Sequence, residues 1–235
     1  GQNNAYLNFT KVGAGAFTIS GANVYGGATT VNAGTLRLGA AGVIPDGASA
    51  GNVSLAGALD LNGFSETING LSGAGTVDTV AGGAPTLTVG GNNASSMFSG
   101  AIQDTAGALA LTKTGTGAFV LGGGSPNTYS GTTTINTGHL VLSNSADVVA
   151  VPGNITMANA SSPDTWMRAN GQLGGSGILT FTGGGGNARF DVFGTSQALA
   201  GLVEDDGNRV GVVQNSEAIN GAPSTTDPGT LTLNG

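Results

Sequence analysis

The sequence predicts an all-β fold, and its composition gives the first reason. Of the 235 residues, 39% are hydrophobic but only 8% are charged, about a third of the share that is usual in a soluble domain. The chain contains 45 Gly and 7 Pro, so tight turns are frequent, but it has no Gly-X-Y period of the collagen kind. The water-facing surface must therefore consist of Thr, Ser, Asn and Gln, whose short side chains suit strands better than helices.

The alternation of apolar and polar residues is the second reason. Short runs of this kind predict strands with one buried face, and turn signals such as Asn62-Gly63 and Asn170-Gly171 separate them. No window shows the apolar stripe and end caps of a helix. The apolar pairs, in chain order, are Phe17/Ile19, Leu36/Leu38, Val53/Leu55, Leu59/Leu61, Leu87/Val89, Leu109/Leu111, Phe119/Leu121, Leu140/Leu142, Ile155/Met157, Leu179/Phe181, Phe190/Val192 and Leu231/Leu233.

An internal repeat is the third reason. Residues 9–38 (FTKVGAGAFTISGANVYGGATTVNAGTLRL) return as residues 111–142 (LTKTGTGAFVLGGGSPNTYSGTTTINTGHLVL), and 59–71 return less closely as 190–202. We therefore expect one continuous segment, 1–235, built of two unequal units of about 9–110 and 111–235. An irregular excursion near 145–189 interrupts the second unit.

The repeat favours a parallel β-helix over a sandwich or a barrel. Outward Thr and Asn recur in both units, and such small side chains can form ladders between stacked coils without charge repulsion. At about 20–25 residues per coil, in the range of solenoid repeats, the chain would hold roughly ten coils.

The two repeated segments resemble the autotransporter-associated β-strand repeat of bacterial passenger domains. Lys113, Gly115, Gly117, Tyr129 and Gly138 occupy places in the family's pattern, and the first segment matches it likewise. The resemblance implies a right-handed parallel β-helix, export to the bacterial cell surface or medium, and a longer parent protein. It does not imply one activity, because passengers of this fold include adhesins, enzymes and inert stalks.

The lysines that precede the glycines invite comparison with a phosphate-binding loop. Such a loop places Lys after its glycines and before a helix, whereas Lys11 and Lys113 come before Gly13 and Gly115 and no helix follows. We expect instead a turn with glycines at positive φ and a lysine at a coil corner.

The chain offers little for catalysis. His139 is the sole histidine, it should point outward, and Thr35 stands at its place in the first unit, so a Ser-His-Asp triad is disfavoured. Asp60 and Asp191 alternate with apolar neighbours and should face water. Glu204-Asp205-Asp206 is the best calcium candidate, although a solvated turn explains it better. We assign no catalytic, cofactor-binding or metal-ligating residue, and expect no enzyme and no cofactor.

Trp166 stands apart because it is the single tryptophan and lies in the excursion. It could protrude on a loop and contact a sugar or protein, or fold back with Met167 over an enlarged coil. The net charge of −7, with six scattered basic residues, argues against nucleic acid as a partner. The absence of Cys is compatible with export through an oxidising compartment.

The sequence thus predicts a non-enzymatic stalk or fibre segment of a secreted or cell-surface bacterial protein, and we interpret it as part of a longer chain. Its expected partners are neighbouring copies of the repeat, including end-to-end self-association. Two alternatives stay open: an adhesin that binds a host or matrix glycan or protein through 145–189, and a polysaccharide-cleaving enzyme. That enzyme would need Asp60, Asp191, Glu204 and Asp206 on one face.

Overall fold

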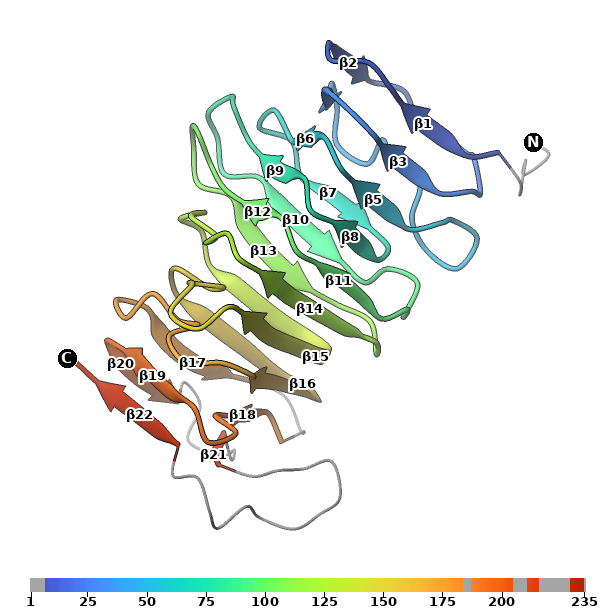
Figure 1. Ribbon diagram of the computed structural model, residues 1–235. Helices are drawn as coiled ribbons and strands as arrows, with labels where there is room; N and C mark the ends of the chain where they lie inside the picture. The colour runs from blue at the N-terminus through green and yellow to red at the C-terminus, as the bar shows by residue number, and fades with distance from the viewer. Residues whose placement is uncertain (1–6, 184–186, 205–210, 216–228, 235) are drawn as a thin grey trace.

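The computed structural model describes residues 7–183, 187–204, 211–215 and 229–234. In these residues the chain winds into a stack of coils made of short parallel strands, a β-solenoid of about eight turns with no helix (Figure 1). The all-β parallel solenoid predicted from the sequence is confirmed, and the expected number of coils is close. No helix in this part of the chain is long and apolar enough to cross a membrane.

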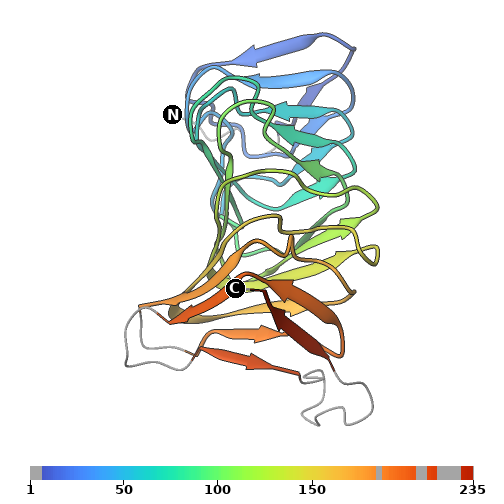
Figure 2. The same cartoon turned by 90° about the vertical axis from the view of Figure 1, so that its left-hand side faces the viewer.

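The strands form three faces that run along the stack, here called face 1, face 2 and face 3 (Figure 2). Strands of successive coils pair in parallel, as β3 does with β1 one coil before it and with β5 one coil after it. Neighbouring strands in a sheet lie about 4.8 Å apart, so each coil lengthens the stack by about that distance.

Face 1 begins with β1 (Phe9–Lys11), β3 (Thr29–Val31), β5 (Val53–Leu55), β8 (Leu71–Gly73), β11 (Ser96–Phe98) and β14 (Ala118–Gly123). It continues with the second halves of β15 (Thr133–Asn144) and β16 (Ile155–Met167), then β18 (Arg189–Asp191) and β21 (Val212–Gln214).

Face 2 contains β2 (Ala16–Ile19), β4 (Thr35–Leu38), β6 (Ala58–Asp60), β9 (Thr76–Asp78) and β12 (Ala101–Ile102), followed later by β19 (Ser196–Leu199) and β22 (Thr230–Leu233). Face 3 contains β7 (Glu66–Ile68), β10 (Thr86–Val89), β13 (Ala110–Lys113), the first halves of β15 and β16, β17 (Ile178–Thr182) and β20 (Gly201–Glu204).

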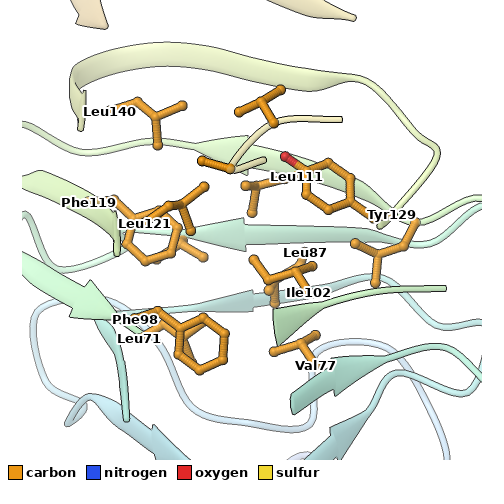
Figure 3. Packing of buried hydrophobic residues seen from close by; sticks show 14 of the residues in the cluster. Leu71, Val77, Leu87, Phe98, Ile102, Leu111, Phe119, Leu121, Tyr129 and Leu140 are labelled. Atoms are coloured by element: carbon orange, nitrogen blue, oxygen red, sulfur yellow. The ribbon is translucent and has the colours of Figure 1, made fainter. Parts of the chain in front are cut away.

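The core fills the inside of the coils with ladders of apolar side chains, as the alternating pattern predicts. Phe98, Leu121 and Leu142 are register partners on successive coils of face 1, and each is at most 1% exposed. Figure 3 shows Phe98 and Leu121 beside inner side chains of the other two faces, among them Ile102 of face 2 and Leu111 of face 3. The repeat residues predicted to point inward, Phe119, Leu121, Ile135, Leu140 and Leu142, are all buried.

The two copies of the repeat lie on different faces of the solenoid. In the first copy the paired strands are β1 with β3 on face 1 and β2 with β4 on face 2. In the second copy the equivalent pairs are β13 with β15 on face 3 and β14 with β15 on face 1. The second copy is therefore turned by one face about the solenoid axis, because the intervening chain makes a little less than five whole coils.

The region near 145–189 continues the coil instead of leaving it. Strand β16 pairs with β15 before it and with β17 and β18 after it. Its register against β15 shifts between Ile135 and Thr137 and again between Thr137 and His139. The extra residues of the second unit are thus partly absorbed at the corner between face 3 and face 1, and the stacking is kept.

Candidate binding surface

The repeated lysines hold a corner of the coil together. The Lys113 Nζ donates hydrogen bonds to the carbonyl oxygens of Thr114, Gly115 (2.7 Å) and, one coil further, Thr137 (3.2 Å). Lys11 does the same in the first copy with Val12, Gly13 and Ala33. Both lysines are buried, and burial lowers the pKa of Lys113 to about 8. The structural role was predicted, and the burial was not, because the sequence did not reveal that the ammonium turns inward.

A second contact marks both copies of the repeat. The Tyr25 hydroxyl is 2.7 Å from the Thr29 hydroxyl, and the Tyr129 hydroxyl is 2.6 Å from that of Thr133. Each pair spans four residues and joins a corner to the strand that follows it. Lysine, glycines, tyrosine and threonine therefore form one supporting unit, which explains why both copies keep these residues.

The expectation that Asp60 and Asp191 face water is wrong. Asp60 is 2% exposed and Asp191 is 1% exposed. Each carboxylate accepts a hydrogen bond from the backbone N–H two residues later, at Asn62 or Phe193, and another from a side chain, Arg37 Nε or Gln214 Nε2. Alternation does point them away from the core, but the next corner of the chain folds over them.

The carboxylates that the enzyme alternative would need do not share a face in the described part of the chain. Asp60 ends β6 on face 2, Asp191 ends β18 on face 1 several coils later, and Glu204 ends β20 on face 3. Glu204 accepts a hydrogen bond from the Gly211 N–H at 3.0 Å. Asp205 and Asp206, and with them most of the calcium candidate, lie outside the described residues. Elsewhere in the part of the chain that the structure describes, no three His, Asp or Glu side chains gather as a metal site.

A cluster of aromatic and charged side chains lies on the outside of face 1, where β15, β16 and β18 run side by side. We call it the aromatic–arginine cluster: His139, Asp164, Trp166, Arg168, Arg189 and Phe193. His139, Asp164 and Arg189 are register partners on three successive coils, and Val141, Trp166 and Asp191 form the neighbouring row. Trp166 therefore lies on the outward side of a strand, neither on a protruding loop nor in the core.

The rings of the cluster stack along the solenoid axis. His139 and Trp166 are stacked with centroids 4.5 Å apart, and Phe193 meets Trp166 edge-on at 6.0 Å. The Arg168 guanidinium carbon lies 4.4 Å from the centroid of Phe193 and 5.5 Å from that of Trp166. Such cation–π contacts favour one orientation of a long side chain that would otherwise be free.

Charge inside the cluster is paired around Asp164. The Asp164 Oδ2 is 3.2 Å from His139 Nδ1, and Oδ1 is 3.9 Å from Arg189 Nε. Neither Asp164 Oδ1 nor His139 Nδ1 has a hydrogen-bond partner among the described residues. Burial raises the pKa of Asp164, and the nearby Arg189 and His139 oppose that shift.

The corner that carries Phe193 differs between the two copies. Phe193 has φ of +43°, and the aligned Asn62 of the first copy has φ of +51°. Asparagine tolerates this left-handed conformation, whereas a bulky aromatic residue is rare there and strained. Sequence reasoning found Trp166 but missed Arg168, Asp164 and Phe193. The exchange of Asp-Leu-Asn-Gly at 60–63 for Asp-Val-Phe-Gly at 191–194 was the signal that could have revealed Phe193.

Comparisons with known proteins agree with this architecture. The model of the passenger-associated-transport-repeat family matches residues 9–38 and 111–142, the two segments that carry the lysine corners. The chain belongs to the proteins that carry this passenger repeat. It is also 36% identical, over 96% of its length, to the Adhesin BmaC autotransporter of Brucella suis biovar 1 (strain 1330).

The passenger-repeat chain spans only 6% of the length of that relative. No solved structure matches it. Within the cluster, only His139 falls in a matched segment, so Asp164, Trp166, Arg168, Arg189 and Phe193 lie outside the repeat that defines the family.

Proposed function

We propose that this segment is a structural, non-enzymatic stalk of a passenger protein that is secreted or held at the bacterial cell surface. The observation that carries the proposal is the unbroken apolar core, which runs through the coils and leaves the repeated polar residues to fasten corners. Stacked coils give length and stiffness from a repeated unit, which is what extension and display require.

The stalk proposal predicts that length follows the number of coils. Residues 71–95 make up one coil, because Gly73 is the register partner of Phe98. A variant in which 71–95 is duplicated should form a rod longer by about 4.8 Å, measured by small-angle X-ray scattering. A duplicated variant that is folded but no longer than the parent would contradict the proposal.

The second candidate is adhesion through the aromatic–arginine cluster, in line with the name of the Brucella relative. The specific support is the placement of strained Phe193 beside the single Trp, since strain in a folded protein is often kept where it serves a function. The partner would be a glycan or protein of the host or its matrix.

Adhesion can be tested by replacing the cluster while the fold is kept. In the double variant Trp166→Thr/Phe193→Asn, binding of the purified segment to host cells should fall to background. The matched control, Thr30→Ala/Ser54→Ala, alters outward residues of face 1 several coils away and should bind normally. Equal binding by both variants would reject adhesion through this surface.

We also propose that coils of the same kind pack end to end. In the second copy Phe119, the equivalent of Phe17, is fully buried between neighbouring coils, so a coil of this kind can stack on another through this side chain. Sedimentation should show concentration-dependent assembly that the Phe17→Thr variant weakens. Monomers alone at high concentration would argue against it.

A further inference from the structure

We propose that the aromatic–arginine cluster binds the carboxylate of an acidic sugar in a glycan chain, with Arg168 as the residue that contacts it. This inference rests on the adhesion candidate above and names the ligand class of the same surface.

Arg168 is held ready for a planar anion. Its guanidinium lies against Phe193 and Trp166, yet its side chain is exposed, and no described residue accepts a hydrogen bond from it. A guanidinium offers a planar fork of N–H donors that matches both oxygens of a carboxylate. Because the rings already restrict the side chain, binding should cost less conformational entropy than it would for a free arginine.

The acidic residues nearby are engaged by other groups. Asp164 faces His139 and Arg189, and its exposed fraction is 9%. Asp191 is buried and accepts hydrogen bonds from Gln214 Nε2 and from the Phe193 N–H. Arg168 is consequently the exposed cation of the cluster that no described acidic side chain neutralises, although the chain as a whole carries −7.

Trp166 belongs to a row of outward-facing register partners that runs along face 1, and the composition of this row favours a glycan as the ligand. In the first four coils of face 1 the row is hydroxylic, with Thr10, Thr30, Ser54 and Ser72 as register partners. From the fifth coil it turns apolar, with Met97, Val120, Val141 and Trp166 on successive coils about 4.8 Å apart.

Such a row fits a chain of sugar rings that lies along the solenoid axis. The apolar C–H faces of the rings would contact the row, and the acidic group of one ring would reach Arg168. Met97 is exposed and Val120 and Trp166 are half-buried, so these three side chains can contact a ligand, whereas Val141 is buried between them.

The strain at Phe193 supports a ligand-binding role. At the equivalent corner of the first copy, Asn62 adopts the same left-handed backbone conformation, so this conformation does not require an aromatic side chain. The ring instead lies against Arg168. Phe193→Asn should therefore relieve strain and keep or raise the melting temperature while it releases Arg168.

The test is titration calorimetry of the whole segment with hyaluronan oligosaccharides, in which every second sugar carries a carboxylate. Arg168→Gln should weaken binding at least about tenfold. Arg168→Lys should also weaken it, because the charge is kept but the planar fork is lost. Thr30→Glu is the matched control, since it also makes the net charge more negative by one on the same face but several coils away from the cluster, and it should change binding less than about threefold.

The ligand has its own controls. The methyl ester of the same oligosaccharides keeps the sugars and removes the charge, so it should not bind, and neither should dextran. Heparin fragments that bind while hyaluronan does not would show a sulfate site and overturn the carboxylate assignment. Equal losses for Arg168→Gln and Thr30→Glu would also overturn it, because they would indicate unspecific electrostatic attraction.

The outcomes separate this inference from the adhesion proposal. If the segment binds a host protein through the cluster but no hyaluronan, the acidic-sugar inference fails and adhesion stands. If the Trp166→Thr/Phe193→Asn variant adheres normally, adhesion through this surface fails as well. Phe193→Asn that folds and still binds hyaluronan as the parent does would reject the role given to the ring.

Discussion

At the scale of the residue, buried polar groups carry much of the specificity of this fold. Glu66 is 2% exposed, and its carboxylate accepts hydrogen bonds from the N–H groups of Val43 (3.0 Å) and Ile44 (3.2 Å) on the preceding coil. These two hydrogen bonds hold the part of face 3 between β4 and β5, where the chain forms no strand. Burial nevertheless raises the pKa of Glu66 to about 6, because desolvation outweighs these two hydrogen bonds.

Glu66 should make stability depend on pH in a defined window. The folded protein holds a proton on Glu66 up to about pH 6, and the unfolded chain releases it near 4.5. The folded state thus binds more protons between these values, so stability should fall by about 2 kcal/mol as pH rises from 4.5 to above 6. Urea unfolding of the parent and of Glu66→Gln at several pH values isolates this contribution. A difference between the two proteins that does not vary with pH would contradict the assignment.

Lys113 should matter for stability more than an average lysine. Its ammonium joins three carbonyl oxygens from two coils at a site that is 1% exposed. Lys113→Met keeps the apolar stem but leaves these carbonyls without their donor, so unfolding free energy should drop by about 2–4 kcal/mol. Lys11→Met, at the equivalent corner, should show a loss of the same sign. A loss below 0.5 kcal/mol at Lys113, about the size of an ordinary surface change, would show that the corner does not depend on the ammonium.

At the scale of the element, the corners decide whether one coil can lie on the next. Gly34 has φ of +67°, and a Cβ there would lie 2.5 Å from the carbonyl oxygens of Gly13 and Gly15. Gly13 has a similar φ of +75° but open space around it. Substitutions at these two glycines can therefore distinguish the cost of backbone strain, which both would have, from the cost of a steric clash, which only Gly34 would have.

Replacing each of these glycines by alanine should give unequal losses. Gly13→Ala should cost about 1 kcal/mol, the strain of a left-handed alanine. Gly34→Ala should cost several times more, because backbone of the neighbouring coil occupies the place of the new methyl group. Thermal or urea unfolding measures both. Equal losses would mean that the coils can separate enough at this corner to admit a side chain.

At the scale of the whole molecule, stability should depend on whole coils. Residues 53–70 form one coil, since Val53 is the register partner of Leu71. A variant without 53–70 should still unfold cooperatively with a β-type circular dichroism spectrum. Deleting only 62–70 moves every later strand off its face and should abolish the cooperative transition. Two folded variants would show that face register is not required.

Sequence reasoning reached the fold because the signals are local and repeated. The alternation of apolar and polar residues correctly predicted which side chains of β14 and β15 point inward, and the glycines indicated where the corners lie. It failed at Asp60 and Asp191, whose burial depends on a corner that closes over them from the same and the next coil. It located Trp166 as the exception to the repeat, but Phe193 meets Trp166 and Arg168 only because β18 stacks on β16.

The sequence by itself determined the all-β class, the stacked coils, the inward residues and the equivalence of the two lysine corners. These features follow from periodicity and turn chemistry, which act over a few residues. Only the tertiary structure decided that the second copy is turned by one face, that Lys113 points inward, and that the single tryptophan meets an arginine and a strained phenylalanine. The length of every intervening coil determines these contacts, and each residue gained or lost at a corner turns all that follows.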